Sequence, residues 1–204
     1  MKLQVTINIL KIIVRIGFYL LLLFIVLFIT VSVMKLSGVN INNAINPSNA
    51  VTVRAFNSAV TNKEIINQQH TGSYQQISSY LFRPNPNTPA GYYLFFIRVL
   101  YFFISLAILG LLLRALNTIS NTAPFHAKIT RYLRLLAFIY LASELVGVID
   151  YCVISAILDR EFPAMHFRPE MSFGDDLITG LIIFVITFVY ARGVQLQEEQ
   201  QLTV

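Results

Sequence analysis

Three charged residues interrupt segments that are otherwise apolar, and they are the side chains best placed to do chemistry. Arg98 lies in the apolar segment 92–113, and Glu144 and Asp150 lie in the segment 135–158. A charge inside a bilayer costs roughly 2.5–3.5 kcal/mol on insertion scales, so such residues pair or line a polar path. Helix depth places Arg98 level with Asp150, so we expect these two residues to form an ion pair. Glu144 lies nearer the midplane, where we expect it to be protonated or bonded to a tyrosine or serine hydroxyl. This intramembrane charge cluster (Arg98, Glu144, Asp150) predicts a proton or ligand site, or a clamp that fixes helix packing; we favour the clamp.

No catalytic or metal-binding motif accompanies these charges. The histidines, His70, His126 and His166, fall in three different predicted loops, and Cys152 is the single cysteine. The sequence contains no paired metal ligands, no nucleophile elbow and no glycine-rich phosphate loop. We therefore expect a protein that is not an enzyme, with no catalytic residue, no metal and no cofactor.

A second set of candidate residues lies outside the apolar segments, in the loop before residue 135 and in the tail after residue 191. The loop carries basic side chains at threefold spacing, which suits lipid phosphates or an acidic partner. The tail carries two acidic residues and an apolar end, so we expect Glu198 or Glu199 near Arg131 or Arg134. The whole set, named here the partner surface, is Lys128, Arg131, Arg134, Glu198, Glu199, Leu202 and Val204.

Four apolar segments, about 16–34, 92–113, 135–158 and 177–191, must position these residues. The first holds nineteen uncharged residues, and at ~1.5 Å per residue such a helix spans the roughly 30 Å hydrocarbon core. It is too long for the apolar region of a signal peptide, so we expect it to remain as an anchor. The sequence predicts an all-α membrane protein, a bundle of four transmembrane helices forming one membrane domain over residues 1–204.

Composition agrees with a membrane protein. Hydrophobic residues make up 56% of the chain and charged residues 12%, whereas soluble domains contain about 25% charged residues. The net charge of +5 comes from scattered basic residues, several of which flank apolar segments. Basic residues at the ends of membrane spans are accounted for by the positive-inside rule, without any nucleic acid. We therefore expect membrane lipid as a partner and no direct contact with nucleic acid.

The basic residues also predict an orientation. Eight of them crowd into short segments on the side of the chain termini, whereas four of the seven on the other side are spread through the loop 35–91. Positively charged short segments stay in the cytoplasm. We therefore expect a multipass protein of the cell (inner) membrane with both termini cytoplasmic and the loop 35–91 outside.

The outer loop 35–91 is polar and predicts little regular structure. Alternation around Val51 and Val53, and a weaker pattern from about Tyr74 to Phe82, are compatible with one or two short hairpins. The proline-rich stretch 83–89 predicts a rigid turn back to the membrane. Few apolar residues are available for a core. We favour a mostly irregular polar cap over a ligand-binding domain.

The loop and tail also carry a family resemblance. Pro124-Phe125 before Arg131, Leu133 and Arg134, together with the tail motifs Arg192-Gly193-Val194, Leu196, Glu198-Glu199 and Leu202-Thr203-Val204, resembles the bacterial four-helix membrane family called domain of unknown function 2975. Ile129 and Gln201 depart from its pattern, in which asparagine and an acid are usual. Members are typically encoded beside a small Cro/C1-type helix-turn-helix protein, so the resemblance implies a transcription regulator as partner and implies no reaction.

These observations lead to one preferred function and two alternatives. The preferred function is a sensor or regulator in which the outer loop and the intramembrane charge cluster respond to a stimulus and the partner surface holds or releases a soluble regulator. The first alternative is a small transporter or channel subunit that uses Arg98, Glu144 and Asp150 along a polar path, which at four spans would require a homo-oligomer. The second is immunity to a membrane-active peptide.

Overall fold

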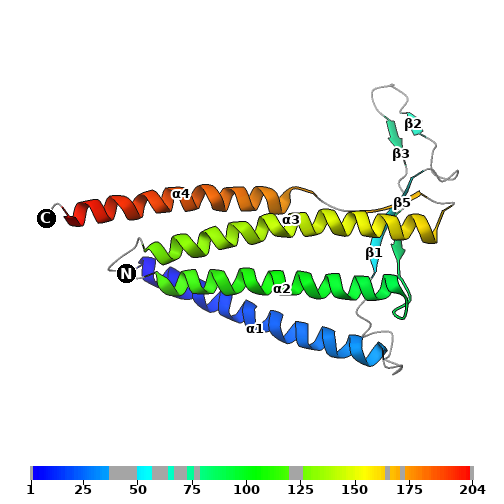
Figure 1. Cartoon of the computed structure of the whole chain (residues 1–204), viewed down its shortest axis with the longest axis horizontal. Coiled ribbons are helices and arrows are strands. Elements are labelled where there is room, and N and C mark those ends of the chain that lie inside the picture. Colours follow the sequence, from blue (N-terminus) through cyan, green and yellow to red (C-terminus); the bar gives the residue numbers. More distant parts are fainter. Residues whose placement is uncertain are drawn as a thin grey trace.

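The computed structural model describes residues 2–36, 50–56, 64–66, 73–75, 79–119, 126–163, 166–170 and 173–202. Four long helices lie roughly side by side, with the start of α1 and the end of α4 at one end of the molecule and the strands at the other (Figure 1). All four are long and apolar enough to cross a membrane. The predicted fold class is therefore confirmed: the protein is all-helical in class and each predicted span lies within one helix. The helices are α1 (Lys2–Leu36), α2 (Pro89–Thr118), α3 (Ala127–Glu161) and α4 (Asp175–Leu202).

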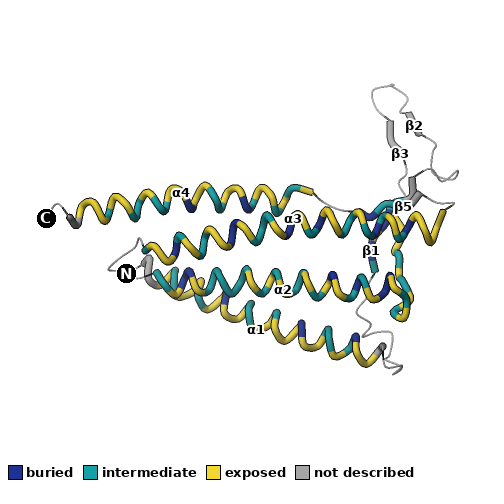
Figure 2. The backbone as a smooth tube through the Cα atoms, in the orientation of Figure 1, coloured by how far each residue is buried: buried dark blue, intermediate teal, exposed yellow. Residues whose placement is uncertain are grey.

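The helices pack in sequence order as a row. α1 packs on α2, α2 on α3, and α3 on α4; among the described residues, α1 and α4 therefore have one helical neighbour each. The Phe28 ring of α1 meets the Phe102 ring of α2 edge-on at 5.2 Å between centroids. Much of the apolar helix surface is exposed (Figure 2). An exposed apolar surface suits contact with lipid. The backbone tolerates lipid as well, because each helix satisfies its hydrogen bonds internally.

Local sequence explains where α2 and α3 begin. The Thr88 hydroxyl accepts a hydrogen bond from the backbone N–H of Gly91 at 3.2 Å, and Pro89 occupies the first helical turn, where a missing N–H costs nothing. At α3, the His126 ring accepts from the backbone N–H of Lys128 at 3.4 Å. Both caps satisfy N–H groups that have no partner within the helix.

A small antiparallel sheet covers the end of the helices opposite the termini. Its order is β4-β1-β5, with Val53 of β1 opposite both Tyr80 of β4 and Pro169 of β5. A separate two-stranded ladder pairs β2 with β3. Alternation in the outer loop was compatible with short hairpins, although we favoured a mostly irregular loop. β5 lies in the connection after α3, where the sequence predicted no strand. The strands are β1 (Val51–Phe56), β2 (Glu64–Ile66), β3 (Ser73–Gln75), β4 (Ser79–Phe82) and β5 (His166–Pro169).

The best-buried core of the molecule lies where the sheet meets the ends of α2 and α3. Its residues come from two strands and two helices, and Leu158 of α3 is 0% exposed. By sequence, the outer loop contains too few apolar residues for a core of its own. The structure overcomes this shortage because the sheet packs its apolar face on the helix ends. The outer part is therefore a docked sheet with an apolar core: Val51, Val53, Leu94, Ile97, Ile154, Leu158 and Phe167.

The fourth helix begins beside the middle of α3 and continues past the start of α3. The backbone N–H of Gly174 donates to Oε1 of Glu144 at 2.8 Å. At the other end, the backbone N–H of His126 donates to the hydroxyl of Tyr190 at 3.0 Å. The twelve residues 191–202 of α4 therefore extend about 18 Å beyond the first turn of α3, at ~1.5 Å per residue.

Candidate functional site

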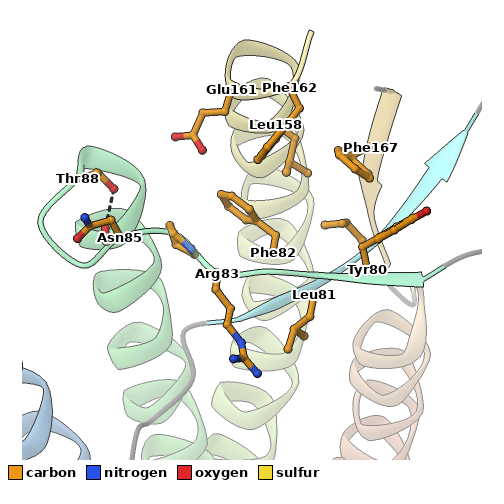
Figure 3. Close-up of a pocket in the computed structure, with 12 residues that line it drawn as sticks. Tyr80, Leu81, Phe82, Arg83, Asn85, Thr88, Leu158, Glu161, Phe162 and Phe167 are labelled. Carbon is orange, nitrogen blue, oxygen red and sulfur yellow. Dashed lines mark hydrogen bonds between the residues drawn. The ribbon is translucent and has the colours of Figure 1, made fainter. Parts of the chain in front are cut away.

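A pocket of about 460 Å³ opens between the sheet and the end of α3. In Figure 3 the side chain of Phe82 reaches from β4 toward α3, whereas Leu81 and Arg83 project from the opposite side of the strand. This alternation follows from the two-residue period of a strand. The lining residues are Val53, Tyr80, Leu81, Phe82, Arg83, Pro84, Asn85, Thr88, Leu158, Glu161, Phe162 and Phe167.

Four aromatic rings form a continuous wall of this pocket. Phe162, just after α3, meets the rings of Phe82 at 5.9 Å and Phe167 at 5.6 Å between centroids, both edge to face. Phe167 in turn contacts Tyr80 at 5.6 Å. Edge-to-face packing fixes ring orientations and adds about 0.5–1.5 kcal/mol per pair beyond area burial. The wall therefore joins β4, β5 and α3 into one pre-formed apolar surface.

The rim of the pocket is polar. Asn85 and Thr88 belong to the turn before α2, in which the Thr88 hydroxyl donates to the backbone carbonyl of Asn85 at 2.7 Å. The carboxylate of Glu161 extends toward this turn (Figure 3), and it has no hydrogen-bond or ion-pair partner among the described residues. An apolar wall with a few convergent polar groups is the usual form of a small-molecule or peptide site.

Two ion pairs hold the sheet together around the pocket. Arg54 of β1 pairs with Glu170 just after β5, and Arg168 of β5 pairs with Asp159 of α3 at 2.7 Å. The hydrogen bond to Asp159 raises the pKa of the Arg168 guanidinium above its usual value. Both pairs are partly exposed, and exposed pairs contribute only ~0–1 kcal/mol. They act mainly by fixing how β5 lies against β1 and α3.

The intramembrane charge cluster does not contain the ion pair that we expected. Asp150 accepts a hydrogen bond from the hydroxyl of Tyr93 at 2.9 Å. Nη2 of the exposed Arg98 lies 3.5 Å from the backbone carbonyl of Ala50, just before β1. Arg98 and Asp150 form no salt bridge in the described part of the chain, because equal depth does not set the rotation of each helix about its axis. In place of the predicted ion pair with Arg98, Asp150 therefore has a neutral hydrogen-bond donor, the hydroxyl of Tyr93.

The three predicted charges nevertheless gather in one region. The Glu144 carboxylate binds the backbone N–H before α4 and so connects α3 with α4, whereas a tyrosine or serine hydroxyl was one expected partner. Tyr101 of α2 lies near these charges. Sequence reasoning missed Tyr93, Tyr101 and Asp176 here, although their depths could have indicated them. The charged side chains within electrostatic reach of Tyr101 are Arg98, Glu144, Asp150 and Asp176.

We expect Tyr93→Phe to destabilise the protein by about 1–3 kcal/mol, because the change leaves a half-buried carboxylate without its donor. The measurement is a double-mutant cycle with Asp150→Asn, read as the unfolding midpoint in detergent. A matched cycle replaces Tyr93→Phe by Arg98→Gln. The coupling free energy with Asp150 should be larger for Tyr93 than for Arg98. The reverse order would support the Arg98–Asp150 ion pair expected from the sequence.

The partner surface is only partly assembled by the fold. Lys128, Arg131 and Arg134 are all exposed on the first two turns of α3. Glu198 lies on the part of α4 that extends beyond α3, about eight residues past Tyr190 and hence ~12 Å away along the axis. The structure therefore does not bring Glu198 or Glu199 to Arg131 or Arg134, since the tail continues α4 instead of folding back. The side chain of Leu202 and the whole of Val204 lie outside the described residues.

The pocket itself was not found from the sequence. Its wall combines β4, β5 and the end of α3, which share no motif or spacing; Tyr80 and Phe167 are 87 positions apart. The one available signal was the alternation that places Tyr80 and Phe82 on the same face of a strand. His70 and the structural surroundings of His166 lie outside the described residues. No cluster of metal ligands occurs among the residues that the structure describes.

Comparison with known proteins identifies one family. Residues 67–204 match the family model described as "Protein of unknown function (DUF2975)". The matched region contains β3, β4, α2, α3, β5 and α4, while α1 and β1 precede it. No curated protein and no solved structure matches the chain.

Proposed function

Since its family model covers more than half of its length, this chain belongs to the DUF2975 family, and we propose that it is a membrane sensor acting through a soluble regulator. This is the family that the motifs in the loop before residue 135 and in the tail after residue 191 resemble. Four apolar helices support a multipass membrane protein. In the proposal, the outer pocket binds a ligand and the basic residues at the start of α3 hold or release the regulator. The proposal includes no catalysed reaction.

The observation that carries this proposal is the continuity of α3. Leu158 and Glu161 line the pocket at one end of this 35-residue helix, and Lys128 and Arg131 are exposed at the other. A continuous helix transmits an axial shift or rotation along its length, as in known helix-shift transitions. A ligand that moves the end of α3 would therefore move the basic residues as well. The two ends would respond together only if the ligand favours one position of α3.

The orientation proposed is that of the sequence analysis. The basic end of α3 and both termini face the cytoplasm of the inner membrane, and the sheet and its pocket lie outside. The crowding of basic residues into short segments on the terminal side supports this orientation. It would expose the pocket to extracytoplasmic ligands and the basic stripe to soluble proteins.

The partner proposed is a small helix-turn-helix transcription regulator of the Cro/C1 type. Lys128, Arg131 and Arg134 are exposed and recur at threefold spacing, so they offer one positive stripe to an acidic face of such a protein. The regulator itself, and not this chain, would contact DNA. Membrane lipid surrounds the helices in either state.

We expect a helix-turn-helix protein to co-purify with the tagged full-length chain and to be identified by mass spectrometry. The combined change Lys128→Gln, Arg131→Gln and Arg134→Gln should remove it, because the positive stripe is lost. Arg160→Gln, an exposed change at the opposite end of α3, is the control. Phe162→Ala in the pocket should alter the amount retained without reducing membrane insertion. Absence of any such regulator, or indifference to the triple change, would contradict the proposal.

A transporter or channel subunit is the second candidate. The observation that favours it is the group of charges around Tyr101, together with a helix that begins beside Glu144, as discontinuous helices do in transporters. Flux in liposomes that depends on Glu144 and Asp150, but not on the stripe of α3, would favour this candidate over the sensor.

A further inference from the structure

A groove of about 630 Å³ runs along α2 on the half of the molecule nearer the chain termini, away from the outer pocket. Its floor contains Ala107 and Gly110, whose small side chains make it deep. Phe18 of α1 forms one wall, and its ring lies 3.6 Å from the position that a Cβ would occupy at Gly110. Leu135 and Ile139 of α3 form the other wall. Three helices thus line an open groove that is apolar along most of its length.

Cationic side chains gather at one end of this groove. Arg114 and Asn117 line the groove itself. Arg131 lies four residues before Leu135, and Arg15 lies three residues before Phe18, so each stands one turn from a lining residue on the same helix face. All three arginines are exposed, and their guanidinium groups have no hydrogen-bond or ion-pair partner among the described residues. The groove therefore has an apolar body and one unneutralised positive end.

The length of the groove suits one leaflet of a bilayer. Phe103 and Asn117 lie fourteen positions apart on α2, or about 21 Å at ~1.5 Å per residue. The hydrocarbon of one leaflet is roughly 15 Å thick, half of a ~30 Å core. One extended acyl chain would thus fill the apolar part while its head group reaches the arginines.

We propose that this groove binds one anionic glycerophospholipid, with an acyl chain along α2 and its phosphate at Arg114. Charge complementarity favours this occupant over a helix from a second copy of the chain. An apolar helix would cover the arginines without supplying a counter-charge, whereas a phosphate accepts several N–H donors at once. The site is separate from the outer pocket, and it shares only Arg131 with the partner surface.

The test is native mass spectrometry of the full-length chain released from detergent with added phosphatidylglycerol or phosphatidylcholine of identical acyl chains. The wild-type chain should retain one phosphatidylglycerol in preference to phosphatidylcholine. Arg114→Gln should weaken phosphatidylglycerol retention by about tenfold, as expected for one lost charge-assisted contact, and remove the preference. Arg160→Gln, a change of the same kind at the end of α3 remote from the groove, should leave it intact.

A second variant tests the apolar part of the site. Gly110→Leu fills the floor beside Phe18 and should reduce retention of both lipids, provided that its unfolding midpoint stays near that of the wild-type chain. Glycerol phosphate, which lacks acyl chains, should not displace the lipid. Equal retention of the two lipids by the wild-type chain, or disulfide-linked dimers formed through Ala107→Cys, would overturn the proposal, the latter in favour of a second copy as occupant.

Discussion

Replacing Leu158 with alanine should lower the free energy of unfolding by about 2–5 kcal/mol, the usual cost of truncating a fully buried leucine. Leu158 is 0% exposed and packs in the core that the sheet shares with α2 and α3. Its loss would leave a cavity under the aromatic wall of the pocket. The effect should appear as a lower unfolding midpoint of the purified protein in a mild detergent.

Leu145→Ala is the matched control for this change. Leu145 lies on the same helix and loses the same atoms, but it is 66% exposed and faces the surroundings of the molecule. In detergent its truncation leaves no cavity, so the midpoint should change little. Similar losses for the two leucines would show that the sheet is not docked on α3 as described.

Gly91→Ala should have the second large effect on stability. Gly91 lies directly against the backbone of the tight turn that leads into α2. A Cβ at Gly91 would lie 2.3 Å from the backbone oxygen of Asn85 and 2.8 Å from two backbone atoms of Pro86. Backbone atoms cannot yield as a flexible side chain does, so the turn or the cap at Thr88 must shift. We expect a loss of about 1–3 kcal/mol or more, and faster hydrogen–deuterium exchange in residues 83–91.

Gly17→Ala is the corresponding control in α1. No atom lies within 4 Å of the position that its Cβ would take, and alanine has a higher helix propensity than glycine by up to ~1 kcal/mol. The unfolding midpoint should therefore stay unchanged or rise slightly. If Gly91→Ala is equally harmless, the rim of the pocket at Asn85 and Thr88 is not held by this close approach.

The four helices could be predicted from sequence because hydropathy and length are local properties. The segment 16–34 needs no tertiary contact to be recognised, since nineteen uncharged residues of this composition would span a bilayer in any fold. The turn at residues 83–89 was equally clear, because proline excludes helix interior wherever it occurs. An even number of spans then places both ends of the chain at the same end of the molecule, as Figure 1 shows.

Only the tertiary structure decided which residues meet. Asp150 binds Tyr93 instead of Arg98, Glu144 binds the backbone before α4, and β5 completes a sheet begun more than 100 residues earlier. These contacts depend on how each helix is rotated and shifted along its axis. Hydropathy says little about either, since lipid and protein interior are similarly apolar to a Leu or Phe side chain. The aromatic wall of the pocket likewise exists only because side chains on the docked sheet and the end of α3 pack together, which no local pattern records.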